Sequence, residues 1–320
     1  MKRLLLALAL LTTPALADGL IDNAAGQTLD AKGKPVTFTG LLIGSDGRVT
    51  RLLDKGDKPP KKLDYRLDAK GRALIPGRIA PGQRLMQAAI ATLAREPQMQ
   101  SHPLQPYERD LAFAGLQKHL LSEGFTTVVD LDTSIIDWEV YRRAGDAGRL
   151  RVRILSYAAG LDTMTTVAGN QPTLWLYDGR LRMAGLAVPD SPPFEDARTR
   201  NLISRGTMDG FQVVLLPDGA GATEHALAAI EEVASSYGTD RRWRLQVGAT
   251  TAPDPARLAR SGTLAISDTP QDPRDAAYAA YAETRVGTLT PGMAADFVML
   301  DAKGQPAEVW IGGVRAWVAK

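Results

Sequence analysis

The sequence predicts an α/β fold: a TIM-like (β/α)8 barrel that is complete or one unit short, with a small composite β domain built from both ends of the chain. Two observations favour this fold. Apolar, strand-like runs alternate with helical segments through the middle of the chain, which is typical of parallel βαβ units. Both ends of the chain after the leader are instead rich in β-forming residues and turns.

Residues 1–17 have the three parts of a secretory signal. Lys2-Arg3 supplies the charged start, residues 4–11 form an apolar core, and Ala15-Leu16-Ala17 is a small-residue cleavage site. The apolar core is shorter than the roughly 20 residues that span a bilayer. We expect cleavage before Asp18 and a secreted or periplasmic protein; an uncleaved N-terminal anchor is the alternative.

The amino-acid composition limits the kinds of ligand and partner that we expect this protein to bind. The chain has no Cys, which excludes disulfides and thiolate ligands, and only 3 His. The formal charge of +2 includes Lys2 and Arg3, so the chain after cleavage is close to neutral. Without a basic block we expect no nucleic-acid partner, and no membrane partner after signal cleavage. A small-molecule substrate or ligand is the expected partner.

The ends of the chain predict the β domain. Residues 36–44 and 48–53 are β-rich around an Asp46-Gly47 turn, and 55–62 is a charged, Pro-containing loop. Residues 296–300, 307–311 and 314–318 are strand-like, with a Gly312-Gly313 hairpin turn. We therefore assign residues 18–72 and 285–320 to the composite β domain and residues 73–284 to the barrel.

About seven strand–helix units can be counted within the barrel, where a closed barrel has eight. Residues 160–178 fit no unit well, although 172–177 could hold a missed strand. For the 222–236 helix, Thr223 is the expected N-cap. The expected strands after the first are 126–131, 151–158, 181–188, 211–216, 243–248 and 262–268, and the expected helices are 107–122, 135–147, 195–208, 222–236 and 255–260.

The segment from Pro76 to Arg84 has the frame of a metal-binding first barrel strand, but it contains no imidazole. The entry Leu74-Ile-Pro-Gly-x-Ile79 and the closing segment from Val286 to Asp301 resemble the amidohydrolase superfamily. The pieces between them resemble its family-3 branch of metal-dependent hydrolases; they are residues 108–114, 124–128, 209–213 and 241–245. Members of that branch are commonly longer, and the resemblance implies that this chain lacks segments chiefly between residues 86 and 106 and between residues 268 and 274.

The resemblance implies zinc or another divalent ion, held by imidazoles and carboxylates at the strand ends, that activates water to hydrolyse non-peptide C–N bonds. Carried onto this chain, most ligand positions hold residues that cannot bind a metal. The first-strand His-x-His falls on Gly82-Gln83-Arg84 and its preceding Asp on Ala80. The remaining positions are Ala187 for a Lys, Leu216 and Val247 for two His, and Gln246 for a Glu.

Asp268 is the one surviving ligand position, in Ser267-Asp268. We assign Asp268 as the candidate catalytic residue and the candidate metal ligand. A single carboxylate does not hold zinc, because catalytic sites use about three protein ligands. The family's metal is therefore expected to be absent from this chain.

Other chemical groups give weaker signals. His102, His119 and His225 are interpreted as ordinary exposed histidines. Asp130 and Asp132 could serve in acid–base chemistry, but a solvated loop is favoured. Residues 217–221 could form an anion nest, but plain turn chemistry is favoured, and Ser261 and Ser267 lack a His partner.

Three hypotheses remain. In the first, the protein is a degenerate amidohydrolase, inactive or very weak. In the second, Asp268 and other strand-end carboxylates (Asp130, Asp132 or Asp190) form a replacement site. In the third, the protein is a non-catalytic binding or scaffold protein that holds a small ligand near Arg84. The sequence identifies neither the substrate nor the oligomeric state.

Overall fold

A seven-stranded sheet forms the centre of the protein, in the order β14-β13-β12-β11-β10-β9-β8. The computed structural model describes residues 19–320 except 94–103, 238–239, 248–252 and 268–270. All pairings in this sheet are parallel, and each strand lies beside its predecessor in the chain. The strands are β8 (Arg78–Gln83), β9 (Phe125–Thr133), β10 (Arg153–Ala159), β11 (Leu181–Asp190), β12 (Gln212–Pro217), β13 (Trp243–Gln246) and β14 (Thr263–Ile266).

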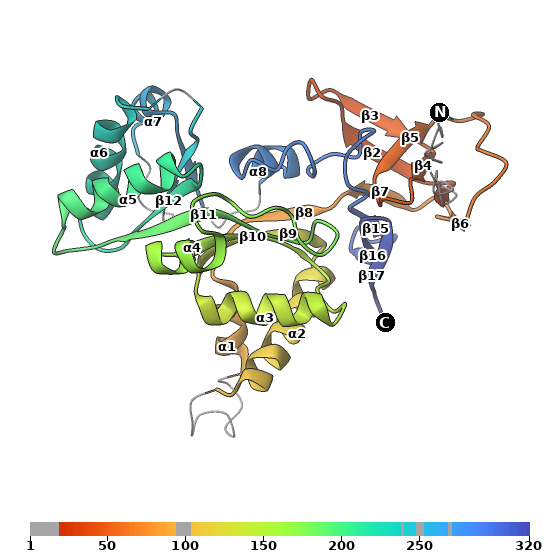
Figure 1. The fold of residues 1–320 in the computed structure, drawn as a ribbon. Helices are drawn as coiled ribbons and strands as arrows, with labels where there is room; N and C mark the ends of the chain where they lie inside the picture. Colours follow the sequence, from red (N-terminus) through yellow and green to blue (C-terminus); the bar gives the residue numbers. More distant parts are fainter. Residues whose placement is uncertain (1–18, 94–103, 238–239, 248–252, 268–270) are drawn as a thin grey trace, which may run out of the picture.

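The predicted α/β barrel is confirmed, and of the two alternatives, eight strands or one fewer, the described residues show seven strands. Seven parallel strands curl into a nearly closed barrel, and among the described residues no pairing joins β14 to β8. Helices flank this sheet (Figure 1). They are α1 (Leu85–Leu93), α2 (Pro106–Ser122), α3 (Ile135–Asp146), α4 (Leu161–Ala168), α5 (Asp196–Met208), α6 (Ala222–Ala234), α7 (Pro255–Ser261) and α8 (Pro273–Ala279).

Side chains alternate between two cores along the strands. In β9, Val128 packs into the large core between strands and helices, whereas Val129 and Leu131 belong to the core inside the barrel. The period of two in a strand produces this division. Strands buried on both faces must be almost continuously apolar, which is why they stand out in the sequence.

Helix α8 helps to fill the barrel interior. Its residues Ala276 and Ala277 belong to the same buried core as Ile79 of β8 and Val214 of β12. Small side chains let a helix approach a sheet closely. The side-chain amide of Gln212 at the start of β12 also donates to the carbonyl of Ala279, at 2.9 Å.

Both ends of the chain meet in one sheet of the order β17-β16-β15-β7-β2-β3, and a four-stranded sheet has the order β5-β4-β1-β6. β15 pairs antiparallel with β7, so the C-terminal strands lie beside the N-terminal ones (Figure 1). The strands are β1 (Gly19–Asp22), β2 (Ala25–Leu29), β3 (Pro35–Phe38), β4 (Gly40–Ile43), β5 (Val49–Leu53), β6 (Tyr65–Asp68), β7 (Ala73–Pro76), β15 (Phe297–Leu300), β16 (Pro306–Ile311) and β17 (Val314–Val318).

Two local predictions are wrong. Gly221, with φ of 76°, is the N-cap of α6 in place of Thr223, because the turn into the helix needs a left-handed residue. The stretch 160–178 holds the helix α4 between Gly160 and Gly169. Residues 172–177 form no barrel strand, and only Leu176 makes an isolated bridge there, to Leu181.

Candidate functional site at the barrel mouth

A cavity of about 790 Å³ opens at the carboxyl ends of the barrel strands. Its volume lies within the roughly 300–1,000 Å³ that is usual for small-molecule sites. The cavity lies where barrel enzymes place their reactive groups. Four strands, β8, β9, β12 and β13, and the helix α1 supply its walls. The lining residues are Gly82, Gln83, Arg84, Gln87, Ala88, Ala91, Leu131, Leu216, Pro217 and Gln246.

The structure brings together most of the positions that the resemblance singled out. Gly82, Arg84 and Leu216, from two strand ends, line this one cavity, and Gln246 of β13 joins them. Val247 packs against the core between strands and helices. The cavity is therefore the place that the family's ligands would occupy, but with other side chains.

Gln246 takes the space that a side chain at position 82 would need. A Cβ added to Gly82 would lie 2.9 Å from Oε1 of Gln246 and 3.1 Å from Cδ1 of Leu131. Contacts of that length require the neighbour to move. Gly82, which has no side chain, leaves the space that the amide group of Gln246 occupies. An imidazole at position 82 would displace Gln246.

Asp268, the candidate catalytic residue and metal ligand, lies outside the described residues. Its neighbour Ser267 follows the end of β14, and β14 pairs with β13, which carries Gln246 at its end. Among the residues that the structure describes, no three His, Asp or Glu side chains gather as a metal-binding group. The described lining offers amides, a guanidinium and alkyl groups, which do not fit the imidazole and carboxylate donors of a zinc site.

Asp130 is not in a solvated loop, so that prediction is wrong. It is only 2% exposed and lies on β9, between the barrel and the outer helices. Its carboxylate accepts hydrogen bonds from the backbone N–H of Leu85 at 2.8 Å, from Thr133 at 2.6 Å and from Tyr141 at 2.8 Å. Burial raises the pKa of Asp130 to about 7, although these hydrogen bonds act in the opposite direction.

Asp132 lies closer than Asp130 to the cavity at the barrel mouth. Its Oδ2 is 3.5 Å from Nε2 of Gln87, a residue of the lining. Burial raises the pKa of Asp132, and the charge of Arg84 works against that rise. The described contacts give the two carboxylates different partners: Asp130 bonds to Tyr141 outside the barrel, and Asp132 lies near Gln87 of the cavity lining.

His225 is the residue that the sequence analysis misjudged. It is not an ordinary exposed histidine: its side chain is 16% exposed and lies between two carboxylates. Nδ1 is 2.7 Å from Asp190 and Nε2 is 2.9 Å from Asp196, and the ring stacks on Phe194 with centroids 4.3 Å apart.

These contacts lie outside the barrel. Asp190 ends β11 and also accepts a hydrogen bond from Thr199 of α5 at 3.3 Å. Burial tends to lower the pKa of His225, but the hydrogen bonds that its ring makes to the carboxylates of Asp190 and Asp196 raise it above its usual 6.5. Asp190 and His225 are far apart in the sequence and show no motif, so only the fold brings them together.

The other candidates have ordinary roles or lie elsewhere. His119 is exposed on α2, as predicted, with Glu123 at 3.5 Å, while His102 lies outside the described residues. Ser261 bonds to Thr263 at 2.7 Å. Gly219 and Gly221 have φ of 95° and 76° and form the turn into α6, as predicted for plain turn chemistry.

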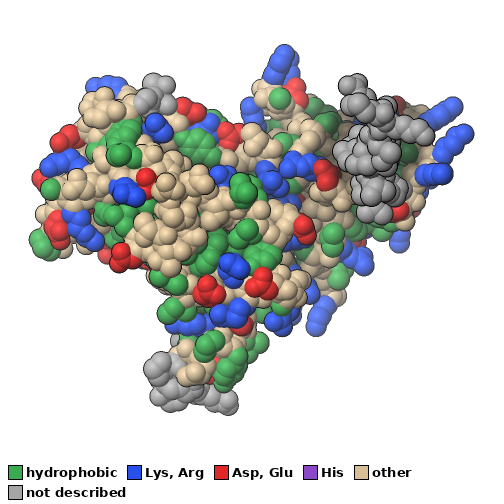
Figure 2. Space-filling view, viewed as in Figure 1, with side chains coloured by type: hydrophobic (Ala, Val, Ile, Leu, Met, Phe, Trp, Pro, Cys, Tyr) green, Lys and Arg blue, Asp and Glu red, His purple; other side chains and the backbone are tan. Residues whose placement is uncertain are grey.

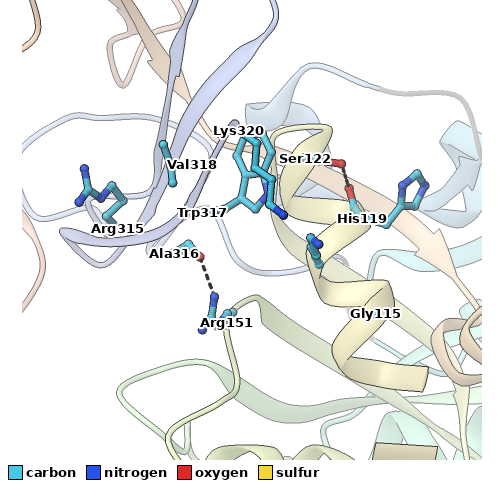
Figure 3. A pocket seen from close by; sticks show the side chains of 10 residues that line it. Gly115, His119, Ser122, Arg151, Arg315, Ala316, Trp317, Val318 and Lys320 are labelled. Atoms are coloured by element: carbon cyan, nitrogen blue, oxygen red, sulfur yellow. Dashed lines mark hydrogen bonds between the residues drawn. The ribbon is translucent and has the colours of Figure 1, made fainter. Parts of the chain in front are cut away.

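A second cavity, of about 720 Å³, lies outside the barrel between α2 and β17. Figure 3 shows Trp317 projecting from β17 toward α2, with Arg151 bonded to the carbonyl of Ala316 at 3.3 Å. The side chains that line it include Lys118 and Lys320 and no acidic residue. It is a basic surface cleft on the side of the barrel, separate from the mouth.

Comparisons with known proteins agree with this geometry. The amidohydrolase family matches residues 68–271, well over half of the chain. No curated protein matches the chain.

Solved structures share the fold at low identity. An uncharacterized metal-dependent hydrolase from Pyrococcus horikoshii is 11% identical, with a TM-score of 0.68 over 89% of this chain and 97% of its own. An adenosine deaminase from Xanthomonas campestris with bound zinc is 14% identical, with a TM-score of 0.65 over 96% and 94%. An atrazine chlorohydrolase from Arthrobacter aurescens complexed with zinc is 13% identical, with a TM-score of 0.63 over 93% and 94%.

The strand-entry and closing motifs, the seven-stranded barrel and the family match all agree, and this chain belongs to the amidohydrolase family.

Proposed function

We propose that this protein keeps the amidohydrolase fold but has lost the metal-dependent hydrolysis of non-peptide C–N bonds, and is inactive or very weakly active. One observation carries the proposal. At the barrel mouth, the ligand positions that line the cavity hold Gly82, Arg84 and Leu216. None of these side chains donates an electron pair to a zinc ion, and the guanidinium repels one.

The replacements also suit a protein without a metal. Leu216 is 4% exposed and packs in the barrel core with Val214 and Leu131. An imidazole left there without a metal would need another hydrogen-bond partner in an apolar core. Alkyl side chains remove that need.

A replacement site made of carboxylates has less support. Asp130 and Asp190 bond to groups outside the barrel, the first to Tyr141 of α3 and the second to His225 of α6. Of the three described candidates, Asp132 alone approaches the cavity lining, through Gln87. One described carboxylate near the mouth, with Asp268, is short of the three ligands of a usual catalytic metal site.

Metal analysis of the purified full chain tests the proposal. Protein dialysed against zinc or manganese and then desalted is expected to hold well under one ion per chain, and to hydrolyse no N-acyl amino acid or cyclic amide above the rate of a heat-inactivated sample. Stoichiometric metal that the Asp268→Asn variant loses would contradict the proposal and favour the replacement site.

A second candidate function is non-catalytic binding of a small ligand at the mouth. The specific observation is the cavity of about 790 Å³ with Arg84, Gln83 and Gln87 on its rim. Amides and a guanidinium donate hydrogen bonds without requiring a metal. Saturable thermal stabilisation by a ligand that the protein does not turn over would support this function.

The proposed location is outside the cytoplasm, secreted or periplasmic. The support is the Lys2-Arg3 start and the Ala15-Leu16-Ala17 site in a segment outside the described residues. In the part of the chain that the structure describes, no helix is both long and apolar enough to cross a bilayer. Mass spectrometry of the exported protein should find Asp18 at its N-terminus.

On the face seen in Figure 2, acidic and basic side chains are interspersed over the barrel, which supports the expectation of no nucleic-acid partner.

A further inference from the structure

Arg244 is a buried positive charge inside the barrel. It lies on β13 and is 0% exposed, the largest of the fully buried side chains in the described part of the protein. Its Nη2 donates to the carbonyl of Pro81 on β8, across the barrel. Nε and Nη1 have no hydrogen-bond partner among the described residues, and no described carboxylate forms an ion pair with this guanidinium.

A second buried arginine in the same barrel, Arg153, is neutralised by a carboxylate. Arg153 on β10 is 2% exposed, and its Nε and Nη2 bond to the two carboxylate oxygens of Asp296 at 2.6 and 2.9 Å. Its Nη1 bonds to the carbonyl of Gly179 at 2.7 Å. A guanidinium buried in this barrel can therefore have hydrogen-bond partners for all of its nitrogen atoms. Arg244 departs from this pattern, and its unpaired donors need an explanation.

The ring of Tyr157 gives Arg244 only partial compensation. The guanidinium carbon lies 5.2 Å from the ring centroid, within the range of a cation–π contact. The quadrupole of the Tyr157 ring attracts a cation more weakly than a carboxylate does. It also accepts no hydrogen bond from Nε and Nη1 of Arg244, which have no described partner. An unpaired buried charge lowers the stability of a folded protein. Its presence therefore indicates either that the protein keeps the charge for a function or that a bound anion normally neutralises it.

Arg244 lies just below the cavity at the mouth. Gln246 is two residues further along β13, on the same face of the strand, and lines the cavity. Gly82 also lines it and directly follows Pro81, the acceptor of Arg244. About 7 Å separates residues two apart in a strand, so the unpaired donors lie one layer beneath the cavity floor.

The lining of the mouth carries one guanidinium, that of Arg84. The side chain of Arg84 is exposed on the cavity lining, and its charge acts on the nearby carboxyl group of Asp132, whose pKa it lowers. A cation at the entrance of a cavity with low-dielectric walls raises the local concentration of anions. The walls further in are apolar, made by Leu131 and Leu216.

We propose that the barrel binds a small monocarboxylate with an apolar body, whose carboxylate passes Gln246 and pairs with Arg244 while Arg84 guides its entry. The proposal deepens the second candidate function, small-ligand binding at the mouth, and rests on it. A planar guanidinium with open donors matches a carboxylate in shape and charge, and Leu131 and Leu216 match an apolar body. Gln246 is the side chain that must move, because it lies between the cavity and Arg244, two residues further along the same face of β13.

The test uses the full chain after signal removal, at constant ionic strength. Benzoate is titrated against the protein by calorimetry and thermal unfolding, with neutral benzamide as the matched compound and methyl phosphate as the competing anion. Saturable binding of benzoate, without binding of benzamide, is expected. The Arg244→Met variant should weaken benzoate binding about tenfold or more, and Arg84→Gln should weaken it less.

Stability provides an independent readout. Without ligand, Arg244→Met should be as stable as the unsubstituted protein or more so, because an unpaired charge is removed. Arg153→Met should be less stable, because Asp296 is left unpaired. If Arg244→Met does not fold, Arg244→Lys replaces it and should retain weakened benzoate binding.

Three results would overturn the proposal: no saturable benzoate binding, binding unchanged in Arg244→Met or in its replacement Arg244→Lys, or tighter binding of methyl phosphate than of benzoate. Zinc content and hydrolysis are measured on the same protein. Stoichiometric zinc would end the proposed loss of metal chemistry whatever benzoate does, so the two failures can be distinguished.

Discussion

The guanidinium of Arg153 and the carboxylate of Asp296 form a two-pronged ion pair that joins the barrel to the sheet at the chain ends, with nitrogen–oxygen distances of 2.6 and 2.9 Å. Arg153 begins β10, and Asp296 directly precedes β15. The side chains are 3% and 4% exposed. Asp296 also accepts a hydrogen bond from the backbone N–H of Gly312 at 2.7 Å, so one carboxylate holds three elements together.

Removal of one partner from this pair should be costly. We expect Arg153→Met to lower the free energy of unfolding by about 3–5 kcal/mol, because the buried carboxylate of Asp296 loses its counter-charge. Urea denaturation gives the value. The matched control is Arg66→Met, which breaks an exposed pair with Asp22 and should cost about 1 kcal/mol or less. Equal effects of the two substitutions would contradict the assigned role.

Two barrel glycines should respond differently to alanine. A Cβ at Gly185 would lie 2.1 Å from the ring of Tyr157 and 2.5 Å from the backbone oxygen of Gln212. At Gly82 the nearest atom is the far end of the Gln246 side chain, at 2.9 Å, which can move. Gly185→Ala should therefore destabilise by about 1–3 kcal/mol, and Gly82→Ala by clearly less. Thermal unfolding of both variants checks the order, and the reverse order would show that Gln246 is rigidly held.

The buried Asp130 should make stability fall as pH rises. Its pKa in the folded protein is about 7, above the 3.8 of an ordinary Asp, because burial disfavours the charged form. The folded state then binds a proton that the unfolded state has lost, so this contribution declines from about pH 4 to about pH 7. Asp130→Asn should remove that decline, measured as the difference in unfolding free energy between the variant and the unsubstituted protein. A difference that does not change with pH would refute the assignment.

His225 should contribute to stability in its protonated form. Burial acts to lower its pKa, but Asp190 and Asp196 raise it above 6.5. The contribution is complete below pH 6.5 and is lost as pH rises through the folded pKa. NMR titration of the ring protons should give a midpoint above 6.5 for His225, and His225→Gln should flatten the stability profile there. A midpoint at or below 6.5, or a stability profile that His225→Gln leaves unchanged, would contradict the prediction.

The sequence predicted the barrel and most of its strands because buried parallel strands are apolar along their whole length. Some elements that the sequence analysis did not predict, such as α1, form where a tertiary contact decides the local structure. The start of α1 is an example: the backbone N–H of Leu85 bonds to Asp130, which is 45 residues away on β9. No local pattern around Leu85 contains that partner.

The sequence by itself indicated the resemblance to the family, a barrel of seven or eight strand–helix units and the lack of imidazoles at the expected ligand positions, because these depend on residue type and order along one chain. Only the tertiary structure decided which charged groups are paired. Arg153 and Arg244 look alike in the sequence, as single arginines in apolar strands, yet one meets Asp296 and the other meets no described carboxylate. The energy of a buried charge depends on what lies within a few ångströms in space, and that distance is set by the fold.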